Sequence, residues 1–477
     1  MNEIHEECGL FGIALKEKKK IAYDAYYALY ALQHRGQEGA GIAISSDGVI
    51  SLHKDAGLVN EVFTPTVISS MPEGERAIGH VRYSTTGADR RLNAQPLMIN
   101  HLKGRMAIAH NGNLTNDAEL REELEKKGSI FHTTSDTEVI AYTITKHRLS
   151  SSSLEEAVSK TMDEIKGAFS LLVMSPTKLI AARDPWGFRP LCMGEYEGGY
   201  VFSSESCAFD AVGASFIRDV EPGEIITVHE DGRITEDKSH TRREKKSLCV
   251  FEFIYFARPD SIIDGASVQK ARQRAGAFLA LESPVQADIV IGVPDSGIEA
   301  ALGYSRQSGI PYGIGLIKNK YIGRTFISPD QKDRENSVRI KLSPVRSAVE
   351  NKRVVLVDDS IVRGTTSKRI VKLLREAGAK EVHFMSSAPK FLYPCYFGTD
   401  IDSSENLFAY KYSDEEMRRI LDVDSIHFLS VESVVKLTDS GERGFCTACF
   451  SSEYPTEPPK GGNKDRYSQP IKKGKER

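Results

Sequence analysis

Apolar residues follow two different patterns along this chain, and the change falls near residue 240. Before it, most apolar runs are short and are bounded by turn residues, as in Gly41–Ile44 and Ser170–Met174. Such runs are typical of antiparallel strands. Stretches with helical spacing interrupt them at residues 21–33 and near residues 116–127 and 136–148. The first part therefore predicts an α/β layered fold with antiparallel sheets.

After a charged stretch at residues 232–247, apolar strands alternate with helices. Alternation of this kind predicts parallel βαβ units, in which helices flank a parallel sheet. We therefore expect two α/β domains, residues 8–240 and 241–455, followed by a disordered polar tail at 456–477. The strands expected in the second domain cover residues 287–293, 313–317, 354–357 and 381–385.

Composition narrows the class of protein. The 477 residues exceed one typical domain, and 63 Lys and Arg against 66 Asp and Glu give a net charge of −3, which does not argue for a nucleic-acid partner. No apolar run is long enough to span a membrane, and residues 1–7 are polar, so we expect no membrane partner and a cytoplasmic location. The seven cysteines are too sparse for a disulfide framework, and we interpret Cys192 and Cys207 as core thiols.

The stretch Val354–Ser367 combines a buried strand with candidate chemistry. Four apolar residues are followed by Asp358 and Asp359, then by small and hydroxylic residues, and helical spacing begins at Lys368. Ligands bind at the carboxyl ends of strands in such sheets, backbone N–H groups before a helix bind phosphate, and paired acids suit Mg²⁺ or vicinal hydroxyls. An ordinary turn with two solvated acids is the alternative. The whole unit favours a site for a sugar phosphate with a divalent ion.

The same residues resemble the 5-phosphoribosyl-1-pyrophosphate (PRPP) motif of the phosphoribosyltransferases, nearly letter for letter. The resemblance implies a type I phosphoribosyltransferase domain with PRPP contacts from Asp358, Asp359, Ser360, Arg363, Gly364, Thr365, Thr366 and Ser367. It also implies PRPP contacts from the turn after residues 287–293, namely from Asp295, Ser296 and Gly297. Ser296 would join Asp358 and Asp359 around Mg²⁺. Taken alone, that turn is equally well explained as an ordinary strand-to-helix connection.

Residues 318–350 show no clear periodicity, which is typical of a lid or of a disordered segment. The resemblance implies a lid that orders when PRPP binds, with Lys318, Lys320 and Arg324 contacting phosphates or the developing charge. These individual roles follow from the resemblance and not from the pattern of the segment itself.

Cys8 opens an apolar run, Cys-Gly-Leu-Phe-Gly-Ile, that resembles the start of the N-terminal-nucleophile glutamine amidotransferases. In that family the first residue of the mature chain is a cysteine. Its thiol attacks the glutamine amide, and its own α-amine, which titrates at about 7.7–8.0, serves as the base. Residues 1–7 would then be a propeptide that is removed. A cysteine buried in a strand is the alternative for Cys8 taken alone.

Four further stretches match that family in sequence order. The resemblance implies that Arg82 pairs with the α-carboxylate of glutamine and that Asp136 takes its α-ammonium. It implies an oxyanion hole from Asn111 and the backbone N–H of Gly112. Asn-Gly alone is only a hairpin signal, but coincidence is a poor explanation for five matches in order. The four stretches are His34–Gly41, Gly79–Gly87, His110–Asn113 and Ser135–Glu138.

Cys446 and Cys449 form a Cys-x-x-Cys pair, which by itself fits zinc, redox chemistry or an iron–sulfur cluster. Cys249 and Cys395 are available as two more ligands. Four thiolates suit either zinc or [4Fe–4S], and their spacing does not separate the two. The four positions match the ligands of an iron–sulfur branch of the amidotransferases, and this resemblance favours [4Fe–4S].

Together the resemblances cover residues 8 to about 455 and imply a member of the glutamine PRPP amidotransferase family, in its iron–sulfur, propeptide-processed branch. The implied reaction converts PRPP, glutamine and water into 5-phosphoribosylamine, glutamate and pyrophosphate, the first committed step of purine synthesis. Ammonia released at Cys8 would pass to the PRPP site, and Tyr83 is a candidate link between the two sites. The family also implies inhibition by purine nucleotides and a homotetramer.

Two other interpretations stay open at this point. An amidotransferase of the same N-terminal class could carry sugar-isomerase repeats in its second half, although the loop at Asp358 and Asp359 argues against them. The chain could also be a regulator that binds PRPP or nucleotides and never unmasks Cys8. Glutamate release from glutamine, measured with and without PRPP, would separate an enzyme from a regulator.

Overall fold

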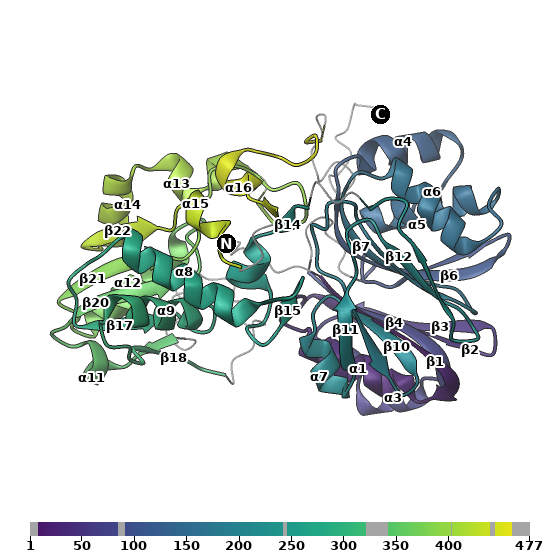
Figure 1. The fold of residues 1–477 in the computed structure, drawn as a ribbon, viewed down its shortest axis with the longest axis horizontal. Coiled ribbons are helices and arrows are strands. Elements are labelled where there is room, and N and C mark those ends of the chain that lie inside the picture. Colours follow the sequence, from purple (N-terminus) through teal and green to yellow (C-terminus); the bar gives the residue numbers. More distant parts are fainter. Residues whose placement is uncertain are drawn as a thin grey trace, which may run out of the picture.

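The structure is a computed structural model that describes residues 8–83, 91–241, 246–320, 342–401, 403–438 and 444–459. Figure 1 shows two halves side by side, the N-terminal half in purple to teal and the C-terminal half in green to yellow. The expected propeptide, Arg324 and most of the expected tail lie outside the described residues. In the described part of the chain, none of the helices combines the length and the apolar character that a membrane span requires.

The N-terminal half contains two antiparallel sheets, as the sequence predicts. One has seven strands in the order β11-β9-β10-β1-β4-β2-β3, and the other has six in the order β13-β12-β8-β7-β6-β5. The first consists of β1 (Gly9–Lys19), β2 (Gly39–Ser46), β3 (Val49–Ala56), β4 (Gly74–Arg82), β9 (Cys192–Tyr196), β10 (Gly199–Ser203) and β11 (Ser215–Asp219). The second consists of β5 (Leu97–His101), β6 (Gly104–Leu114), β7 (Gly167–Met174), β8 (Leu179–Arg183), β12 (Ile225–Val228) and β13 (Ile234–Asp237).

The two sheets pack on each other through their inner faces, and helices cover their outer faces (Figure 1). In β1, Leu10 packs between the sheets with Leu172, whereas Phe11 packs outward with Leu29. Burial on both faces explains the continuous apolar run after Cys8. The helices of this half are α1 (Ile21–Ala31), α2 (Val59–Val62), α3 (Pro65–Ser70), α4 (Asp117–Lys126), α5 (Asp136–Arg148), α6 (Leu154–Glu164) and α7 (Cys207–Val212).

The C-terminal half is built on a four-stranded parallel sheet in the order β17-β20-β21-β22. Alternate residues of the central strand pack on opposite layers: Val355 and Val357 toward α8 and α9, Val354 and Leu356 toward α12 and α14. The prediction of a strand buried on both faces is confirmed. The elements are β17 (Ile289–Gly292), β20 (Arg353–Asp358), β21 (Glu381–Ser386), β22 (Ser425–Phe428), α8 (Val268–Glu282), α9 (Ile298–Ser308), α12 (Thr365–Glu376) and α14 (Asp414–Leu421).

Shorter elements complete this half. Strand β14 pairs in parallel with β23, with Leu248 opposite Phe445 and Cys249 opposite Cys446, so the end of the described chain returns to the start of this half. The shorter elements are β14 (Leu248–Cys249), the π-helix η1 (Glu252–Phe256), β15 (Ile262–Ile263), β16 (Ala266–Ser267), β18 (Leu316–Lys318), β19 (Leu342–Pro344), α11 (Arg346–Val349), the 3₁₀ helix η2 (Ser404–Asn406), α13 (Phe408–Lys411), α15 (Val431–Val434), β23 (Phe445–Cys446) and α16 (Ala448–Ser451).

Two sequence-based expectations in this half are wrong in detail. The strand expected at residues 313–317 pairs with the parallel sheet only at its start, where Tyr312 forms a parallel bridge with Val290 of β17 and the N–H of Gly313 donates to the carbonyl oxygen of Val290 at 2.9 Å. Residues Leu316–Lys318 form β18, which pairs antiparallel with β19. A Cβ atom at Gly313 or Gly315 would lie 2.5 or 2.7 Å from the side chain of Ile289 or Ile291, so the backbone there packs closely against β17. The helix expected from Lys368 instead begins at Thr365, so the hydroxylic residues form its first turn.

Candidate active sites

Cys8 lies immediately before β1, where the ends of two strands meet. Its Sγ donates to the carbonyl oxygen of Tyr83 at 3.8 Å, just beyond β4, and Gly9 pairs with Val81 of that strand. The carbonyl oxygen of Cys8 accepts a hydrogen bond of 3.1 Å from Nε of Arg35. The half-buried thiol is therefore placed at a strand end, and the main chain of Cys8 is tied to a buried guanidinium.

The segment His110–Asn113 of β6 carries the expected oxyanion-hole residues. Asn111 is fully buried, yet neither its Nδ2 nor its Oδ1 has a hydrogen-bond partner among the described residues. Buried amides are almost always hydrogen-bonded, so this side chain is arranged for a partner that comes from outside. Gly112 has φ +143°, and a Cβ atom on it would lie 2.1 Å from the carbonyl oxygen of Ala168, so only glycine fits this backbone.

A buried histidine joins the two sheets close to this segment. His80 of β4 lies opposite Leu10 of β1, and its Nε2 lies 3.1 Å from the carbonyl oxygen of His110 in β6. Burial lowers the pKa of His80 to about 3, so the imidazole is neutral and donates to that carbonyl. The strand that follows Cys8 is therefore tied, through β4, to the strand that carries Asn111.

Arg82 and Asp136 bring opposite charges to this region. Arg82 is the last residue of β4 and is almost fully buried. The burial of neighbouring Lys54, together with the charge of Arg82, lowers the pKa of Lys54 to about 8. The carboxylate of Asp136, at the start of α5, accepts a 3.0 Å hydrogen bond from the backbone N–H of Leu114 and lies 3.5 Å from Nδ1 of His110. Burial alone would raise the pKa of Asp136, but His110 and these hydrogen bonds lower it below its usual value.

We expect the substitution Asn111→Ala to separate activity from stability. It removes no hydrogen bond within the described residues, so the melting temperature should change by only a few degrees, about 2–4 °C. If Asn111 supplies an oxyanion donor, as the resemblance implies, its loss should lower the kcat for glutamine hydrolysis by about 10²–10³-fold. Thermal unfolding and glutamate release measure the two effects. A variant that unfolds easily and keeps its kcat would contradict this interpretation of the side chain.

In the C-terminal half, two turns converge at the carboxyl ends of adjacent strands. Gly292 of β17 pairs with Val357 of β20, so the turn that carries Ser296 faces the turn that carries Asp358 and Asp359. The hydroxyl of Ser296 donates to Asp359, and the backbone N–H of Asp359 donates to Asp358 at 2.9 Å. This confirms that the two turns expected to form one site lie together.

The two acids of this site are nearly enclosed by protein. Asp358 and Asp359 are 7% and 8% exposed, so they are not the solvated acids of an ordinary turn. Burial raises the pKa of Asp359, and hydrogen bonds from Ser296 and Ser360 and the charge of Arg272 oppose that rise. Enclosed carboxylates with nearby hydroxyls form an oxygen-rich site of the kind that Mg²⁺ prefers.

The start of α12 completes this site. Gly364 has φ +75°, a left-handed conformation that favours glycine, and the helix begins at Thr365 and Thr366, with Ser367 buried in the first turn. The first turn of a helix presents backbone N–H groups and the positive end of the helix dipole, which together suit a phosphate. Arg363 lies just before this turn and is half-buried.

The other expected PRPP residues lie around the facing turn. Gly297 packs so closely that a Cβ atom would lie 2.5 Å from the carbonyl oxygen of Val357. Lys318 at the end of β18 forms an ion pair of 2.5 Å with Asp295, and Lys320 is exposed two residues later. The structure therefore brings Asp295, Ser296, Gly297 and Lys318 to one side of the site.

The four cysteines singled out by the sequence line one cavity near the joint between the halves. Cys249 and Cys446 are register partners in β14 and β23, Cys395 accepts a 3.4 Å hydrogen bond from the backbone N–H of Phe397, and Cys449 lies in α16. All seven cysteines are free thiols. Within the described ranges, no group of three or more His, Cys, Asp or Glu side chains is already arranged to hold a metal ion. The cavity is lined by Phe188, Cys249, Phe251, Phe391, Cys395, Phe397, Thr399, Cys446, Ala448, Cys449 and Tyr454.

The two remaining cysteines are core residues, as expected. Cys192 and Cys207 are each 2% exposed, and burial raises the pKa of both thiols. Both pack with α1 and the outer face of the first sheet. Cys192, whose Sγ donates to the carbonyl oxygen of Ser203, therefore serves as a control for substitutions at the other thiols, whereas Cys207 contacts Glu205.

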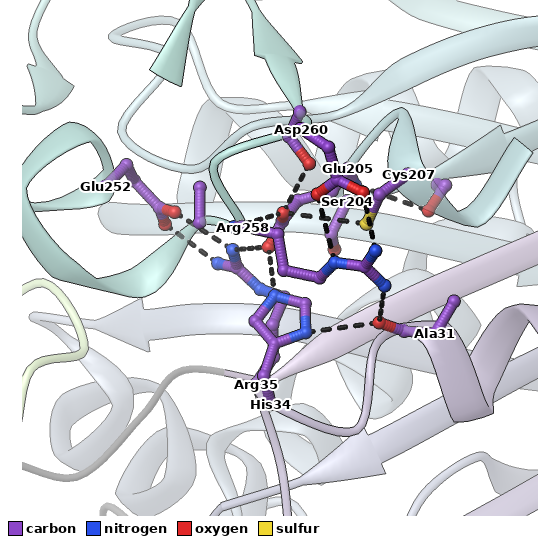
Figure 2. Close-up of polar contacts among 12 residues, drawn as sticks. Ala31, His34, Arg35, Ser204, Glu205, Cys207, Glu252, Arg258 and Asp260 are labelled. Carbon is purple, nitrogen blue, oxygen red and sulfur yellow. Dashed lines mark hydrogen bonds and ion pairs between the residues drawn. The ribbon is translucent and has the colours of Figure 1, made fainter. Parts of the chain in front are cut away.

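One group of buried charges at the joint has no counterpart in the sequence-based prediction. Figure 2 shows Arg35 and His34 of the N-terminal half among Glu205, Glu252 and Arg258. The motif that begins at His34 is visible in the sequence, but Glu252 lies more than two hundred residues away and belongs to no recognised motif. Its partner becomes apparent only in the folded chain.

Comparison with known proteins assigns the two halves. Residues 80–211 match the model of a glutamine amidotransferase domain, and residues 268–390 match that of a phosphoribosyl transferase domain. Over 94% of its length, the chain is 50% identical to the amidophosphoribosyltransferase of Methanocaldococcus jannaschii, of which it covers 98%. The chain belongs to the amidophosphoribosyltransferase family. The amidophosphoribosyltransferase of Bacillus subtilis is 49% identical over 95% of both chains.

Two solved structures have the same fold as this amidophosphoribosyltransferase family member. One is glutamine PRPP amidotransferase from B. subtilis complexed with ADP and GMP, with a TM-score of 0.87, 49% identity and coverage of 94% of this chain and 98% of that one. The other is described as the allosteric regulatory enzyme of purine biosynthesis, with a TM-score of 0.89, 46% identity and coverage of 97% and 99%.

The family membership decides between the interpretations left open by the sequence. The chain is an enzyme of purine biosynthesis that uses glutamine to aminate PRPP. A second half made of sugar-isomerase repeats is excluded, because that half matches a phosphoribosyl transferase domain. The predicted fold class, a glutaminase domain with antiparallel sheets joined to a phosphoribosyltransferase domain with a parallel sheet, is confirmed.

Proposed function

We propose that Cys8, exposed as the first residue by removal of residues 1–7, is the nucleophile of glutamine hydrolysis. The observation that carries this proposal is the buried, unpartnered side chain of Asn111 on a strand tied to the Cys8 region. Such a group is unfavourable without a ligand, and an oxyanion would supply the missing acceptor for Nδ2. The functional units are then residues 8–240 and 241–455.

Glutamine would bind between the opposite charges. Arg82 pairs with its α-carboxylate through the two N–H groups of a guanidinium fork, and Asp136 pairs with its α-ammonium. The lowered pKa of Asp136 keeps its carboxylate charged throughout the physiological range. These contacts hold both charged groups on the α-carbon of glutamine, so that its side-chain amide can extend to Cys8.

The chemistry then needs only groups of this chain and water. The α-amine of Cys8 takes the thiol proton, and the thiolate attacks the amide carbon, while Asn111 Nδ2 and the N–H of Gly112 bind the developing oxyanion. The ammonium returns its proton to the leaving nitrogen, ammonia departs, and a glutamyl thioester forms. Water hydrolyses the thioester and releases glutamate.

The C-terminal site would hold PRPP and receive the ammonia. The first turn of α12, with Gly364, Thr365, Thr366 and Ser367, suits the 5-phosphate, and the turn that carries Asp295, Ser296 and Gly297 suits the pyrophosphate. Ammonia attacks C1 of the ribose as pyrophosphate leaves. Asp358, Asp359 and Ser296 would hold Mg²⁺, which neutralises charge on the pyrophosphate. Ser360, Arg363, Lys318, Lys320 and Arg324 are proposed as further contacts, and Tyr83 as a link between the sites.

The cavity lined by four thiols is proposed to hold a [4Fe–4S] cluster. Its ligands would be Cys249, Cys395, Cys446 and Cys449, four soft donors around one space with aromatic walls. Cys249 of β14, Cys446 of β23, Cys449 of α16 and Cys395 would thus hold a cluster that ties together four segments of the C-terminal half, next to Phe188 of the N-terminal half. The uniform chemistry of the donor set fits the cluster, since all four ligands are sulfur.

The cluster proposal predicts a coloured protein. Anaerobically purified protein should be brown, absorb broadly toward the blue end of the visible range, and contain iron and acid-labile sulfide. Cys249→Ser should remove the colour, whereas Cys192→Ser should retain it because Cys192 lies in the core of the N-terminal half. Colourless protein with one zinc ion per chain would contradict the cluster.

Regulation and assembly are proposed from the relatives. The solved B. subtilis enzyme is complexed with ADP and GMP, and we propose that purine nucleotides also inhibit this chain. We further propose a homotetramer and a cytoplasmic location. Inhibition assays with ADP and GMP and measurement of the mass in solution test the first two of these proposals.

A paired assay tests the proposed function most directly. Glutamate release from glutamine is measured with and without PRPP, alongside phosphoribosylamine formation. Hydrolysis that PRPP stimulates supports two coupled sites. PRPP binding without glutamate release would contradict the assignment of Cys8.

A further inference from the structure

The side chain of Arg35 connects three partners inside the molecule. It is wholly buried, and its Nε donates to the carbonyl oxygen of Cys8 at 3.1 Å. Nη1 donates to Glu205 at 2.6 Å, and Nη1 and Nη2 donate to the two carboxylate oxygens of Glu252 at 2.9 and 2.8 Å. Figure 2 shows this paired contact with Glu252. The guanidinium thus fixes the main chain of Cys8 and is itself fixed by two buried carboxylates.

Glu252 reaches this place from the C-terminal half. It is the first residue of η1 and is fully buried. Its Oε1 also lies 3.5 Å from Nη1 of Arg189, whose Nη2 and Nε donate to the carbonyl oxygen of Phe397 at 2.6 and 3.1 Å. A carboxylate held between two guanidinium groups has little freedom to move.

We propose that Glu252 is a positioning residue for glutamine hydrolysis, acting through Arg35 to hold Cys8 in its reactive geometry. The phosphoribosyltransferase half thereby supplies a carboxylate on which the glutaminase half depends. This inference rests on the proposed function, in which Cys8 is the nucleophile.

The reason lies in how few restraints a terminal residue has. After removal of residues 1–7, no chain precedes Cys8, so its thiol and α-amine are oriented only by its own contacts and by the strand that begins at Gly9. The bond from Arg35 to the Cys8 carbonyl fixes the rotation of that residue relative to the strand. A displacement of about 1 Å between reacting groups can lower a rate by about 10²-fold.

The helix that carries Glu252 is itself held by a buried arginine of α8. Arg272 of α8 donates to the carbonyl oxygens of Phe253, Tyr255 and Ala257, at 2.9, 2.9 and 2.7 Å, and so binds along the whole of η1. The same guanidinium is attracted by Asp359 of the PRPP turn. Arg272 thus holds the helix that carries Glu252 in place.

The experiment compares Glu252→Gln with Asp264→Asn. Both substitutions neutralise a carboxylate that pairs across the joint, since Asp264 binds Arg183 at 2.8 and 3.1 Å, but only Glu252 is connected to Cys8. For Glu252→Gln we expect the kcat of glutamine hydrolysis to fall about tenfold or more, with the KM for glutamine and the ammonia-dependent synthesis changed by less than about twofold. Asp264→Asn should leave all three within about twofold. Glu252→Asp, which keeps the charge, should recover part of the lost kcat.

The outcomes are distinct. If Glu252→Gln lowers ammonia-dependent synthesis as much as glutamine hydrolysis, or if Asp264→Asn has the same effect, Glu252 only holds the halves together and the inference is overturned. An unchanged kcat overturns it as well. If Glu252→Gln does not fold, Arg35→Lys tests the same point, because lysine keeps the charge but cannot bridge Cys8 and both oxygens of Glu252. Failure of the proposed function would appear instead as glutamine hydrolysis that survives Cys8→Ala.

Discussion

Replacing Cys8 with alanine is expected to abolish glutamine-dependent synthesis of phosphoribosylamine and to leave ammonia-dependent synthesis intact. The thiol is the only proposed nucleophile, so its loss should lower glutamate release by at least about 10³-fold. Free ammonia bypasses this step and reaches the PRPP site directly. Assays of the same preparation with glutamine and with ammonium salt measure both rates.

The control for this substitution is Cys192→Ala, which removes a thiol from the core of the same half that is not proposed to react. Intact-mass measurement belongs with the assay, because the proposed base is the α-amine of Cys8. Fully active enzyme that still carries residues 1–7 would refute the proposed mechanism.

Replacing Asp358 with asparagine should lower synthesis and spare basal glutamine hydrolysis, whereas Cys8→Ala should abolish hydrolysis and spare ammonia-dependent synthesis. Synthesis should fall by about 10²-fold or more with either nitrogen source, because the loss of one carboxylate weakens both the Mg²⁺ site and the hold on PRPP. Basal glutamine hydrolysis should persist, since Asp358 lies at the carboxyl end of β20, outside the glutaminase half. Stimulation of hydrolysis by PRPP should be lost.

Asp288→Asn is the matched control for Asp358. Asp288 lies just before β17, at the other end of the parallel sheet, where it pairs with Arg353 at 2.8 Å on the surface. Its replacement should change the rates little, because exposed ion pairs contribute about 0–1 kcal/mol. If Asp358→Asn abolished basal hydrolysis in a folded protein, the two sites could not be separated as proposed.

The elements that the sequence predicts well are those with strong local signals. The bounds of α5 agree with the predicted helix at residues 136–148, because Ser135 provides an N-cap whose hydroxyl accepts from the backbone N–H of Thr137. Strand β20 is evident from its unbroken apolar run, and both of its faces are covered by helices. In such places local preference and burial point to the same structure.

Predictions failed where the backbone conformation depends on neighbours that are distant in the sequence. The residues Thr365–Ser367 have modest helix propensity and follow a glycine, so their sequence favours a loop. Their helical conformation follows from the left-handed turn at Gly364 against Phe408. Similarly, the apolar run near Leu316 resembles a strand of the parallel sheet, but only its start at Tyr312 and Gly313 pairs with β17, and Leu316–Lys318 pair with β19 instead.

In the candidate sites, too, local motifs were predictable and contacts between distant residues were not. Motifs located Asn111 and Asp358, and the structure adds that the amide of Asn111 lacks a partner and that Asp358 is enclosed. The link between Arg35 and Glu252 could not be predicted, because a pairing between residues so far apart leaves no local pattern. The resemblance likewise implied one shared site for four cysteines, and the pairing of β14 with β23 brings Cys249 beside Cys446.

That pairing has a consequence for how the protein tolerates shortening. Because β23 pairs with β14, the last described segment packs at the joint between the halves. A protease that trims the chain back past Phe445 would remove two of the four clustered thiols together with the strand that covers Cys249. Proteolysis from the C-terminal end would thus expose the cavity at the joint between the halves before it removed any strand of the three large sheets.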